Sequence, residues 1–593
     1  MIRNTVIIIL LTLTVTLRGA DANDQPSLQQ LIDQAWQKHQ SGVTIPPGTY
    51  HLSADGKSGH HLNFSGLKNF SIEAANVTLV FVSRDKSSIG FKQCDNVTLH
   101  GVTLLRETAP FSQGKILAIS ADGKTIDVQV DRGYPADFDN PQFFPKIVLN
   151  LFNPQNRQWL DDKGEASSVE RLGPDTFRVH QARAVNSQVG WIVGAAVAWR
   201  GLVRTDIDIN DCHNMKITDL TISGGAGFCV HEHGGLGGNT YRYTVTYGGK
   251  PTGATEQPLI ASNADAFHSS GVRQGPTLED CHFEGMNDDG VPIHGSYALT
   301  MESASNQIIV EVRYPPFCQT GDRMRFNDER GISVAEAKVT NIEPLPDYQL
   351  TTPPPKALRL FQDFAHPKFF RLTLDQSVPA KSGWLVANGD MLGNGFVIRH
   401  CTIRNNRARG MLIKAGDGLI EDCTIQGSSM GGIVVAPEMG VWNESDYARN
   451  LIIRRNTIER CNYWSHPGNS QAGALTVNAY EYGRFVPSST GGHRNILIKD
   501  NTFINNDGPN IVITSASDVT IRNNRFLQPM THPSTNGSGI GIDPGSLFWF
   551  DFCIKLTISG NTYSNPGPYF KSPLTATATV NGSGFDNGIK LEP

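Results

Sequence analysis

The sequence predicts an all-β protein, a right-handed parallel β-helix that carries two small inserted antiparallel β-barrels. Three observations predict this class: a short strand motif that recurs, a composition rich in glycine, and two long stretches that interrupt the motif. Glycine contributes 59 of 593 residues, and charged residues are 18%, against an average near 25%. The net charge of −5 (51 − 56) argues against a nucleic-acid partner. The low charge and the well-represented aromatic residues, 8%, argue against wholesale disorder.

The motif consists of an aliphatic residue, two variable residues, Cys or Asn, one more residue and a second apolar residue. Its fourth positions lie as little as 22 residues apart, from Cys401 to Cys423, which is the length of one β-helix coil. Asn at this position predicts a ladder of stacked side-chain amides. We expect most of the nine cysteines to be small buried coil residues, with one disulfide left open. The copies are residues 278–283, 398–403, 420–425, 453–458, 498–503, 521–526 and 558–563.

The N-terminus has the order of a secretory signal peptide. Arg3 precedes an apolar run over residues 6–17, and Ala20-Asp21-Ala22 supplies the small residues of a cleavage site. We therefore expect residues 1–22 to be removed and the mature protein to be secreted or periplasmic. The run is shorter than the ~20 residues that span a bilayer, and no later segment is apolar enough, so no membrane span is expected.

The rest of the chain divides at the breaks in the motif. Residues 23–105 are expected to form an N-terminal cap, with a helix near residues 27–39, and the first coils. Residues 106–200 and 300–388 are typical of antiparallel strands with turn signals, and these are the two inserted barrels. Residues 201–299 form the coils with the candidate catalytic residues, and residues 389–593 form the C-terminal coils.

The two inserts end in similar segments, residues 185–193 and 378–386, which suggests that the inserts are related. Each segment contains one tryptophan, Trp191 or Trp384. We expect both rings to lie in the insert cores rather than to serve as sugar platforms.

Two acidic segments lie one coil apart. Asp265 and the Asp288-Asp289 pair are separated by 23 residues (288 − 265), and successive coils stack about 4.8 Å apart. We therefore expect the three carboxylates to be neighbours, with repulsion raising at least one pKa. Inverting glycoside hydrolysis requires one protonated and one ionised carboxyl, roughly 6.5–9.5 Å apart. These aspartates are the candidate catalytic residues; a plain turn and a Ca²⁺ site are the alternatives.

Five further residues extend this candidate site. His294 follows the aspartate pair, and Lys414, Glu438, Trp442 and Glu444 fall along the same face if the coils stay in register. Trp442 could stack on the apolar face of a sugar while the two glutamates bind hydroxyl groups. The alternative is a loop tryptophan that packs on its own coil.

A glycine-rich segment contains His231-Glu232-His233, a pair of histidines of the kind that binds metals. Because no third ligand can be identified in the sequence, we expect a loop role. No metal and no other cofactor are predicted.

At these residues the chain resembles the α-1,3-galactosidases of glycoside hydrolase family 110. The resemblance covers roughly residues 40–565 and rests on residues 263–265, 275–295, 415–421 and 437–444. It implies a metal-independent, inverting exo-hydrolase that removes terminal α-1,3-linked galactose from blood-group-B-type or linear Gal-α-1,3-Gal glycans. Carried over by position, the catalytic residues are Asp265, Asp288 and Asp289, and the substrate-binding residues are Asn263, His294, Lys414, Glu438, Trp442 and Glu444.

Three other classes stay open. A polygalacturonase-like hydrolase of family 28 shares several motifs, but its Gly-His-Gly is absent, because Ile293-His294-Gly295 follows the aspartate pair directly. A non-catalytic glycan-binding β-helix would not need three stacked carboxylates, and a lyase would need a Lys or Arg base and usually Ca²⁺. The assignment of acid and base, a fucose requirement and a homo-oligomer also stay open.

Overall fold

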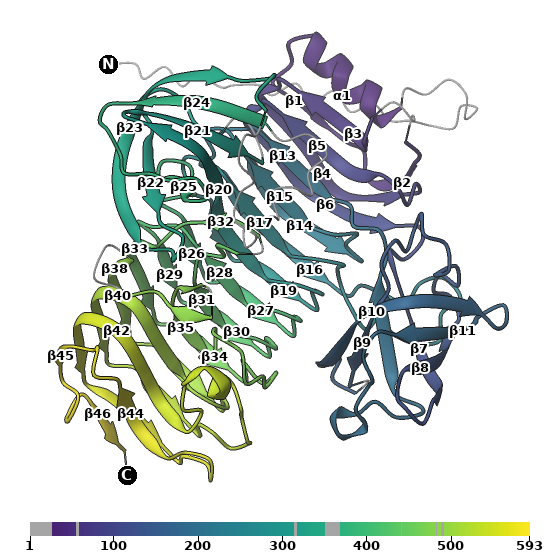
Figure 1. The fold of residues 1–593 in the computed structure, drawn as a ribbon. Coiled ribbons are helices and arrows are strands. Elements are labelled where there is room, and N and C mark those ends of the chain that lie inside the picture. Colours follow the sequence, from purple (N-terminus) through teal and green to yellow (C-terminus); the bar gives the residue numbers. More distant parts are fainter. Residues whose placement is uncertain are drawn as a thin grey trace, which may run out of the picture.

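The computed structural model describes residues 27–592, apart from residues 55–57, 154, 314–316, 350–367, 441, 482 and 488–491. The predicted signal peptide, residues 1–22, lies outside the described residues. Within them the all-β prediction is confirmed, because strands form nearly all of the regular structure. The strands stack one above another, from the purple N-terminal end to the yellow C-terminal end (Figure 1).

The recurring motif builds a column of parallel strands. Its aliphatic residue pairs from coil to coil: Leu278 with Ile398, Ile398 with Ile420, and Ile420 with Ile453. These side chains are fully buried in one continuous core, where each contributes about 1.5–3 kcal/mol. The strands are β18 (Thr277–Glu279), β26 (Val397–Arg399), β29 (Leu419–Glu421) and β33 (Arg449–Arg454).

The predicted amide ladder is confirmed in the C-terminal coils. The side-chain amide of Asn456 donates to Oδ1 of Asn501 at 3.0 Å, that of Asn501 to Asn524 at 2.9 Å, and that of Asn524 to Asn561 at 2.9 Å. Each accepting oxygen also receives the backbone N–H of the asparagine below it. The ladder therefore satisfies buried backbone groups at a turn, where strand pairing is interrupted.

The cysteines fill space in the coils. All nine are unpaired, and all except the half-buried Cys318 are buried. At the motif position, the thiol of Cys401 lies 3.6 Å from the backbone oxygen of Leu278 in the coil below. The expectation of buried coil residues is thus confirmed, and no disulfide forms.

One helix closes the N-terminal end of the core. The helix α1 (Leu28–Gln37) begins after Ser27, whose side chain forms a capping box with Gln30. Leu28, Ile32 and Ala35 are buried on one face and join the coil core, so the helix covers the end that the first coil would expose. Within the described part of the chain, no helix has the length and hydropathy that crossing a membrane requires.

The first insert is a closed six-stranded barrel, in the order β10-β11-β8-β7-β12-β9. Trp191 is 1% exposed in its core and donates its indole N–H to Asp161 at 2.8 Å, as predicted for a core residue. The barrel also contacts the later coils, because the Tyr463 hydroxyl donates to the backbone oxygen of Trp159 at 2.8 Å. Its strands are β7 (Phe111–Ile119), β8 (Thr125–Val130), β9 (Val148–Phe152), β10 (Trp159–Arg171), β11 (Thr176–Gln181) and β12 (Ala196–Arg200).

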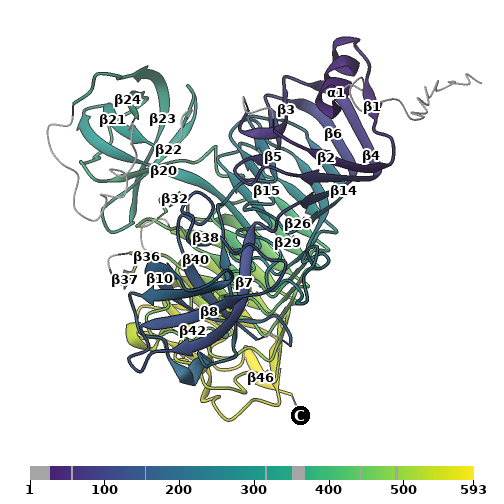
Figure 2. The same cartoon turned by 90° about the vertical axis from the view of Figure 1, so that its right-hand side faces the viewer.

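The second insert is antiparallel, with pairing in the order β20, β21, β24, β23, β22 and β25, and β25 pairs back to β20. Trp384 packs in its core, as predicted. A view turned by 90° shows the insert projecting from the coils at the upper left, apart from the first barrel (Figure 2). Its strands are β20 (Val291–Ala304), β21 (Gln307–Val312), β22 (Arg323–Asn327), β23 (Ser333–Pro344), β24 (Lys368–Leu374) and β25 (Leu385–Asn388).

The ladder makes a testable contribution to stability. Asn501→Ala removes both the acceptor of Asn456 and the donor to Asn524, leaving buried polar groups unpaired at about 1–3 kcal/mol each. We expect a lower thermal-unfolding midpoint by calorimetry. The exposed strand residue Asn63 supplies the control, Asn63→Ala, which should leave the midpoint unchanged. Equal midpoints for the two variants would show that the ladder is dispensable.

Candidate functional site

The three candidate catalytic aspartates meet, as the coil spacing predicts. Asp265 lies just before β17 (Phe267–Ser270), and Asp288 and Asp289 lie just before β20 of the next coil. One carboxylate oxygen from each of the three lies within 4.8 Å of the others. The parallel pairing of β17 with β20 fixes this neighbourhood.

Asp265 is buried and held on both oxygens. Its Oδ1 accepts the backbone N–H of Asp289 at 3.0 Å, and its Oδ2 lies 2.7 Å from Nδ1 of His268. Burial, followed by repulsion from Asp288, raises the pKa of Asp265 well above the ordinary value. This carboxyl therefore retains its proton to a higher pH than an exposed aspartate does.

The other two aspartates are held by arginines. Asp289 is buried and accepts from Arg409 twice, from the backbone N–H at 2.7 Å and from the guanidinium at 3.1 Å. Burial raises the pKa of Asp289 well above its ordinary value, although Arg409 opposes the shift. Asp288 is partly exposed, and it lies 3.1 Å from Arg407 and 3.6 Å from Arg200 at the end of the first barrel. The carboxylates therefore have different electrostatic surroundings, which an acid and base pair needs.

A buried lysine organises the other side of the site. Lys414 follows β28 (Met411–Ile413), is fully buried, and donates to Glu438 at 3.0 Å and to Glu444. The two glutamates face each other across a hairpin, with backbone hydrogen bonds of 3.1 and 3.0 Å. Burial opposes the charge on Lys414, but the two carboxylates raise its pKa, so the ammonium form is retained.

Two histidines connect these halves. Nε2 of His294 lies 3.0 Å from Nε2 of His268 and 3.6 Å from Oε1 of Glu444. Burial lowers the pKa of both histidines to about 4, so both rings are neutral at neutral pH. Burial opposes ionisation of Glu444, yet His294 and Lys414 hold its pKa well below the usual range.

These contacts form a closed chain of side chains. Arg409, which binds Asp289, also lies 3.4 Å from Glu438, and so joins the aspartates to the hairpin. We call the closed set the polar ring. Its members are Asp265, His268, His294, Glu444, Lys414, Glu438, Arg409 and Asp289.

Three predicted residues lie outside the polar ring: Asp288, which borders it, and Trp442 and Asn263. Trp442 is 55% exposed at the tip of the hairpin, and Arg313 of the second insert donates to its backbone oxygen at 3.3 Å. Asn263 is fully buried, and its amide donates to the backbone oxygens of Pro110 and Ala226 at 2.9 and 3.2 Å. Its contacts brace the start of the first barrel against the coil.

Sequence reasoning did not assign roles to three residues of this site. His268 follows Asp265 by three positions and lies in strand β17, where its ring contacts that carboxylate at 2.7 Å. The sequence pattern indicates no role for Arg409, and it gives no signal for Arg200, because a barrel strand carries Arg200 to the coils. The expected loop role of His231 and His233 is wrong, because both lie in strand β15 (Val230–His233).

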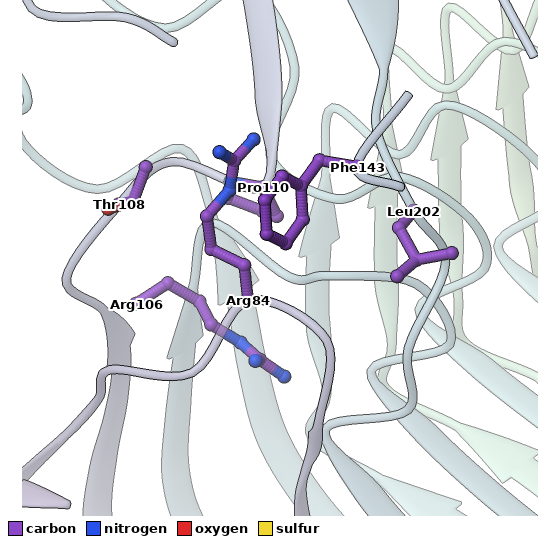
Figure 3. Close-up of a pocket in the computed structure, with 6 residues that line it drawn as sticks. All are labelled: Arg84, Arg106, Thr108, Pro110, Phe143 and Leu202. Atoms are coloured by element: carbon purple, nitrogen blue, oxygen red, sulfur yellow. The ribbon is translucent and has the colours of Figure 1, made fainter. Parts of the chain in front are cut away.

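A small pocket lies where the first barrel leaves the coils (Figure 3). Its two arginines are already paired, Arg84 with Asp137 at 2.7 Å and Arg106 with Asp206 at 3.1 Å. Arg84 also lies over the ring of Phe143, at 4.0 Å. The residues of this pocket therefore help to attach the first barrel to the coils. It is lined by Arg84, Arg106, Thr108, Pro110, Phe143 and Leu202.

The C-terminal coils match a known family model, and a solved structure aligns along most of the chain. Residues 385–590 match the model of the right-handed β-helix region. A solved catalytic domain of a GH87 α-1,3-glucanase aligns over 98% of this chain and 70% of its own, at a TM-score of 0.44 and 10% identity.

Curated relatives have one name in common. "Alpha-1,3-galactosidase A" of Bacteroides fragilis is 24% identical over 52% of this chain and 48% of its own length. "Alpha-1,3-galactosidase B" of Akkermansia muciniphila is 21% identical over 92% of this chain and 68% of its own. The chain thus spans about half the length of the first of these relatives. The resemblance drawn from the motifs is confirmed: the chain is similar in sequence to curated proteins named α-1,3-galactosidase.

Proposed function

We propose that the protein is an exo-acting, inverting glycoside hydrolase that removes terminal α-1,3-linked galactose from blood-group-B-type or linear Gal-α-1,3-Gal glycans. The observation that carries the proposal is the cluster of three aspartates, two of which, Asp265 and Asp289, belong to the polar ring of buried hydrogen-bonding groups. The names of the curated relatives support galactose as the sugar. The proposal includes a right-handed parallel β-helix with two inserted barrels, and export directed by residues 1–22.

The aspartates divide into a proton donor and a base. Asp265 and Asp289 are the buried pair whose raised pKa favours a retained proton, so the general acid belongs to this pair. Asp288 is more exposed and lies beside two guanidinium groups, which stabilise a negative charge. It would take the proton of the attacking water while the acid protonates the leaving oxygen.

The rest of the polar ring suits one sugar. Lys414 offers donors, Glu438 and Glu444 offer acceptors, and neutral His294 can do either, so hydroxyl groups at fixed positions can be bound. The exposed ring of Trp442 can cover an apolar sugar face. The hairpin and the second insert are joined through Arg313, and in this proposal they close one end of the sugar site, as exo action requires.

Inversion rests on the family resemblance. Inverting enzymes usually separate their carboxyl groups by roughly 6.5–9.5 Å and retaining enzymes by about 5–5.5 Å. Here the nearest oxygens lie within 4.8 Å, which by itself does not favour inversion. The stereochemistry of the product is therefore a sharp test.

A Ca²⁺ site formed by the same aspartates is less well supported. Calcium sites offer uncompensated oxygen ligands. Here Arg409 lies 3.1 Å from Asp289, and Arg407 lies 3.1 Å from Asp288, so protein cations already balance the cluster.

Proton NMR of the reaction with Gal-α-1,3-Gal follows the anomeric signal of released galactose. We expect the β-anomer first, because water attacks the face opposite the leaving group in a single displacement. If the α-anomer is released first, the enzyme retains the configuration, and the proposed inversion is wrong. No release of galactose, from this disaccharide or from a fucosylated B-type glycan, would contradict the proposed substrate.

Neutralising each aspartate should strongly lower turnover without unfolding the protein. Asp265→Asn, Asp288→Asn and Asp289→Asn should each lower kcat/KM by about 10²–10⁴-fold, the usual contribution of an acid or base. Asp219→Asn is the matched control, because Asp219 pairs with Arg242 on the exposed coil surface and should leave kcat/KM unchanged. Full activity in all three site variants, with unchanged circular dichroism, would remove the site assignment.

The protonated carboxyl also predicts a pH effect on stability. The folded pKa of Asp265 is raised, so the unfolded chain releases this proton first, near pH 4, while the folded chain keeps it. The stabilising contribution of the proton is complete below about pH 4 and is lost as the pH rises through the folded pKa. Asn resembles the protonated form at every pH.

We therefore compare the unfolding midpoint of Asp265→Asn with that of the unmodified protein. The midpoint of the variant minus that of the unmodified protein should be larger at about pH 8 than at about pH 4. Calorimetry at both pH values measures the difference, with Asp219→Asn as the control. A difference that is constant or falls with pH would show that Asp265 is not the group that retains the proton.

A further inference from the structure

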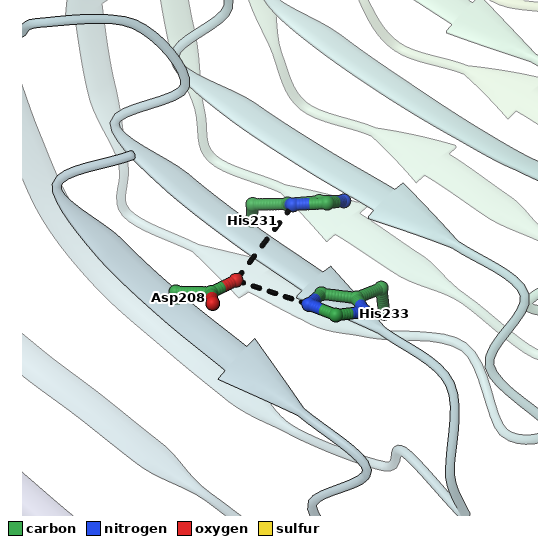
Figure 4. A group of neighbouring side chains, drawn as sticks. All are labelled: Asp208, His231 and His233. Carbon is green, nitrogen blue, oxygen red and sulfur yellow. Dashed lines mark hydrogen bonds and ion pairs between the residues drawn. The ribbon is translucent and has the colours of Figure 1, made fainter. Parts of the chain in front are cut away.

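A second group of titratable side chains lies on the same sheet as the polar ring, toward the N-terminal coils. Asp208 belongs to β13 (Ile207–Asn210), and this strand pairs in parallel with β15, so that Asp208 lies opposite His231 and Asn210 opposite His233. Figure 4 shows both imidazole rings turned toward one carboxylate oxygen of Asp208. The third group that the histidine pair lacks in the sequence is therefore supplied by the coil below.

The strand places the side chains of His231 and His233 on the same face. Glu232 between them is fully buried and accepts hydrogen bonds from Ser269, Tyr241 and Asn239 at 2.6, 2.6 and 2.9 Å. Since side chains alternate along a strand, burial of Glu232 directs His231 and His233 to the opposite, outer face. Their rings stack at 4.6 Å with an interplanar angle of 22°.

The distances suit one small cation. Nε2 of His233 lies 3.0 Å and Nδ1 of His231 lies 3.8 Å from the same oxygen, Oδ1 of Asp208. The three ligand atoms lie within 4.8 Å of one another. Neighbouring ligands of a tetrahedral Zn²⁺ ion, with bonds of about 2.0–2.1 Å, lie about 3.4 Å apart. Small side-chain rotations would bring the three atoms to that spacing.

Neighbouring side chains contact Asp208 and His231 on the atoms that face away from the candidate metal position. The other oxygen of Asp208 lies 3.3 Å from Nε2 of His60, and Nε2 of His231 lies 3.3 Å from the hydroxyl of Ser270. When Nε2–H of His231 donates to Ser270, Nδ1 presents a lone pair to the Asp208 oxygen, and a cation between them satisfies both. Such second contacts orient metal-binding histidines and carboxylates.

The charge at this site is not balanced as it is in the polar ring. In the described part of the chain, the ion-pair partners of Asp208 are His60, His231 and His233, with no arginine or lysine among them. The side chains are 21%, 21% and 32% exposed for Asp208, His231 and His233, so solvent can reach them and fill a fourth position.

We propose that Asp208, His231 and His233 bind a divalent transition metal of the Zn²⁺ class, with solvent or a ligand oxygen at the open position. Two imidazoles and one carboxylate are a recognised ligand set for such ions. The ring of His231 stands 5.1 Å from that of His268 in the polar ring, so the bound ion would lie beside the proposed sugar site. The inference does not depend on the proposed function.

Calorimetric titration of ZnCl₂ into the full-length, chelator-stripped protein tests the site. We expect one ion per chain, and Co²⁺ in place of Zn²⁺ should give visible d–d absorption that Zn²⁺ abolishes. Asp208→Asn and His233→Gln should each weaken binding by at least about 100-fold, and His60→Gln by about 10–100-fold, since it removes an outer contact. Circular dichroism checks that each variant is folded.

Two control variants separate this site from others. His532→Gln changes a histidine that is 70% exposed and paired with Asp507, and should leave binding unchanged. His294→Gln alters the group His268, His294 and Glu444, which also has metal-binding side chains. Absence of stoichiometric binding, equal affinity in Asp208→Asn and His233→Gln, or loss of binding in His294→Gln alone would overturn the proposal.

Discussion

Parallel stacking of one coil on the next is the constraint on which the rest of this molecule depends. Pairing in register aligns equivalent positions of successive coils, so residues more than twenty positions apart become neighbours about 4.8 Å away. The buried aliphatic column, the asparagine ladder and the aspartate cluster are products of that repetition. A change of one residue in register would turn each of these side chains to the opposite face of its strand.

The same stacking concentrates charge, and the structure compensates for it locally. Carboxylates on adjacent coils repel each other, and burial increases the penalty. Arg409, Arg407 and Lys414 lie within hydrogen-bonding distance of these carboxylates. Because Arg409 contacts both Asp289 and Glu438, one side chain couples the electrostatics of the aspartates to those of the hairpin. The site is therefore best understood as one network rather than as a pair of independent catalytic groups.

The sequence allowed prediction of features that repeat with the coil. The spacing of Asp265 from Asp288 predicted their contact, and the recurring Asn predicted the ladder, because both follow from coil length alone. Contacts made by single residues from irregular segments were not predictable in this way. Arg200 reaches Asp288 from a barrel strand. By contrast, Asp208 lies 23 residues (231 − 208) before His231, so coil length could have predicted that contact as well. The flanking glycines suggested a loop at residues 231–233, although the alternation of His, Glu and His is a strand pattern.

The strand β20 has one consequence for how the molecule moves. Its first residues, Val291–Ile293, pair in parallel with β28 in the coil, and its later residues, Tyr297–Leu299, pair with β25 in the second insert. His294 lies between these two pairings, in an unbroken strand. The second insert therefore has no free hinge on that side. A rotation of the insert would be transmitted along the strand as a twist at His294, so a ligand or surface that tilts the insert would act mechanically on the site without touching it.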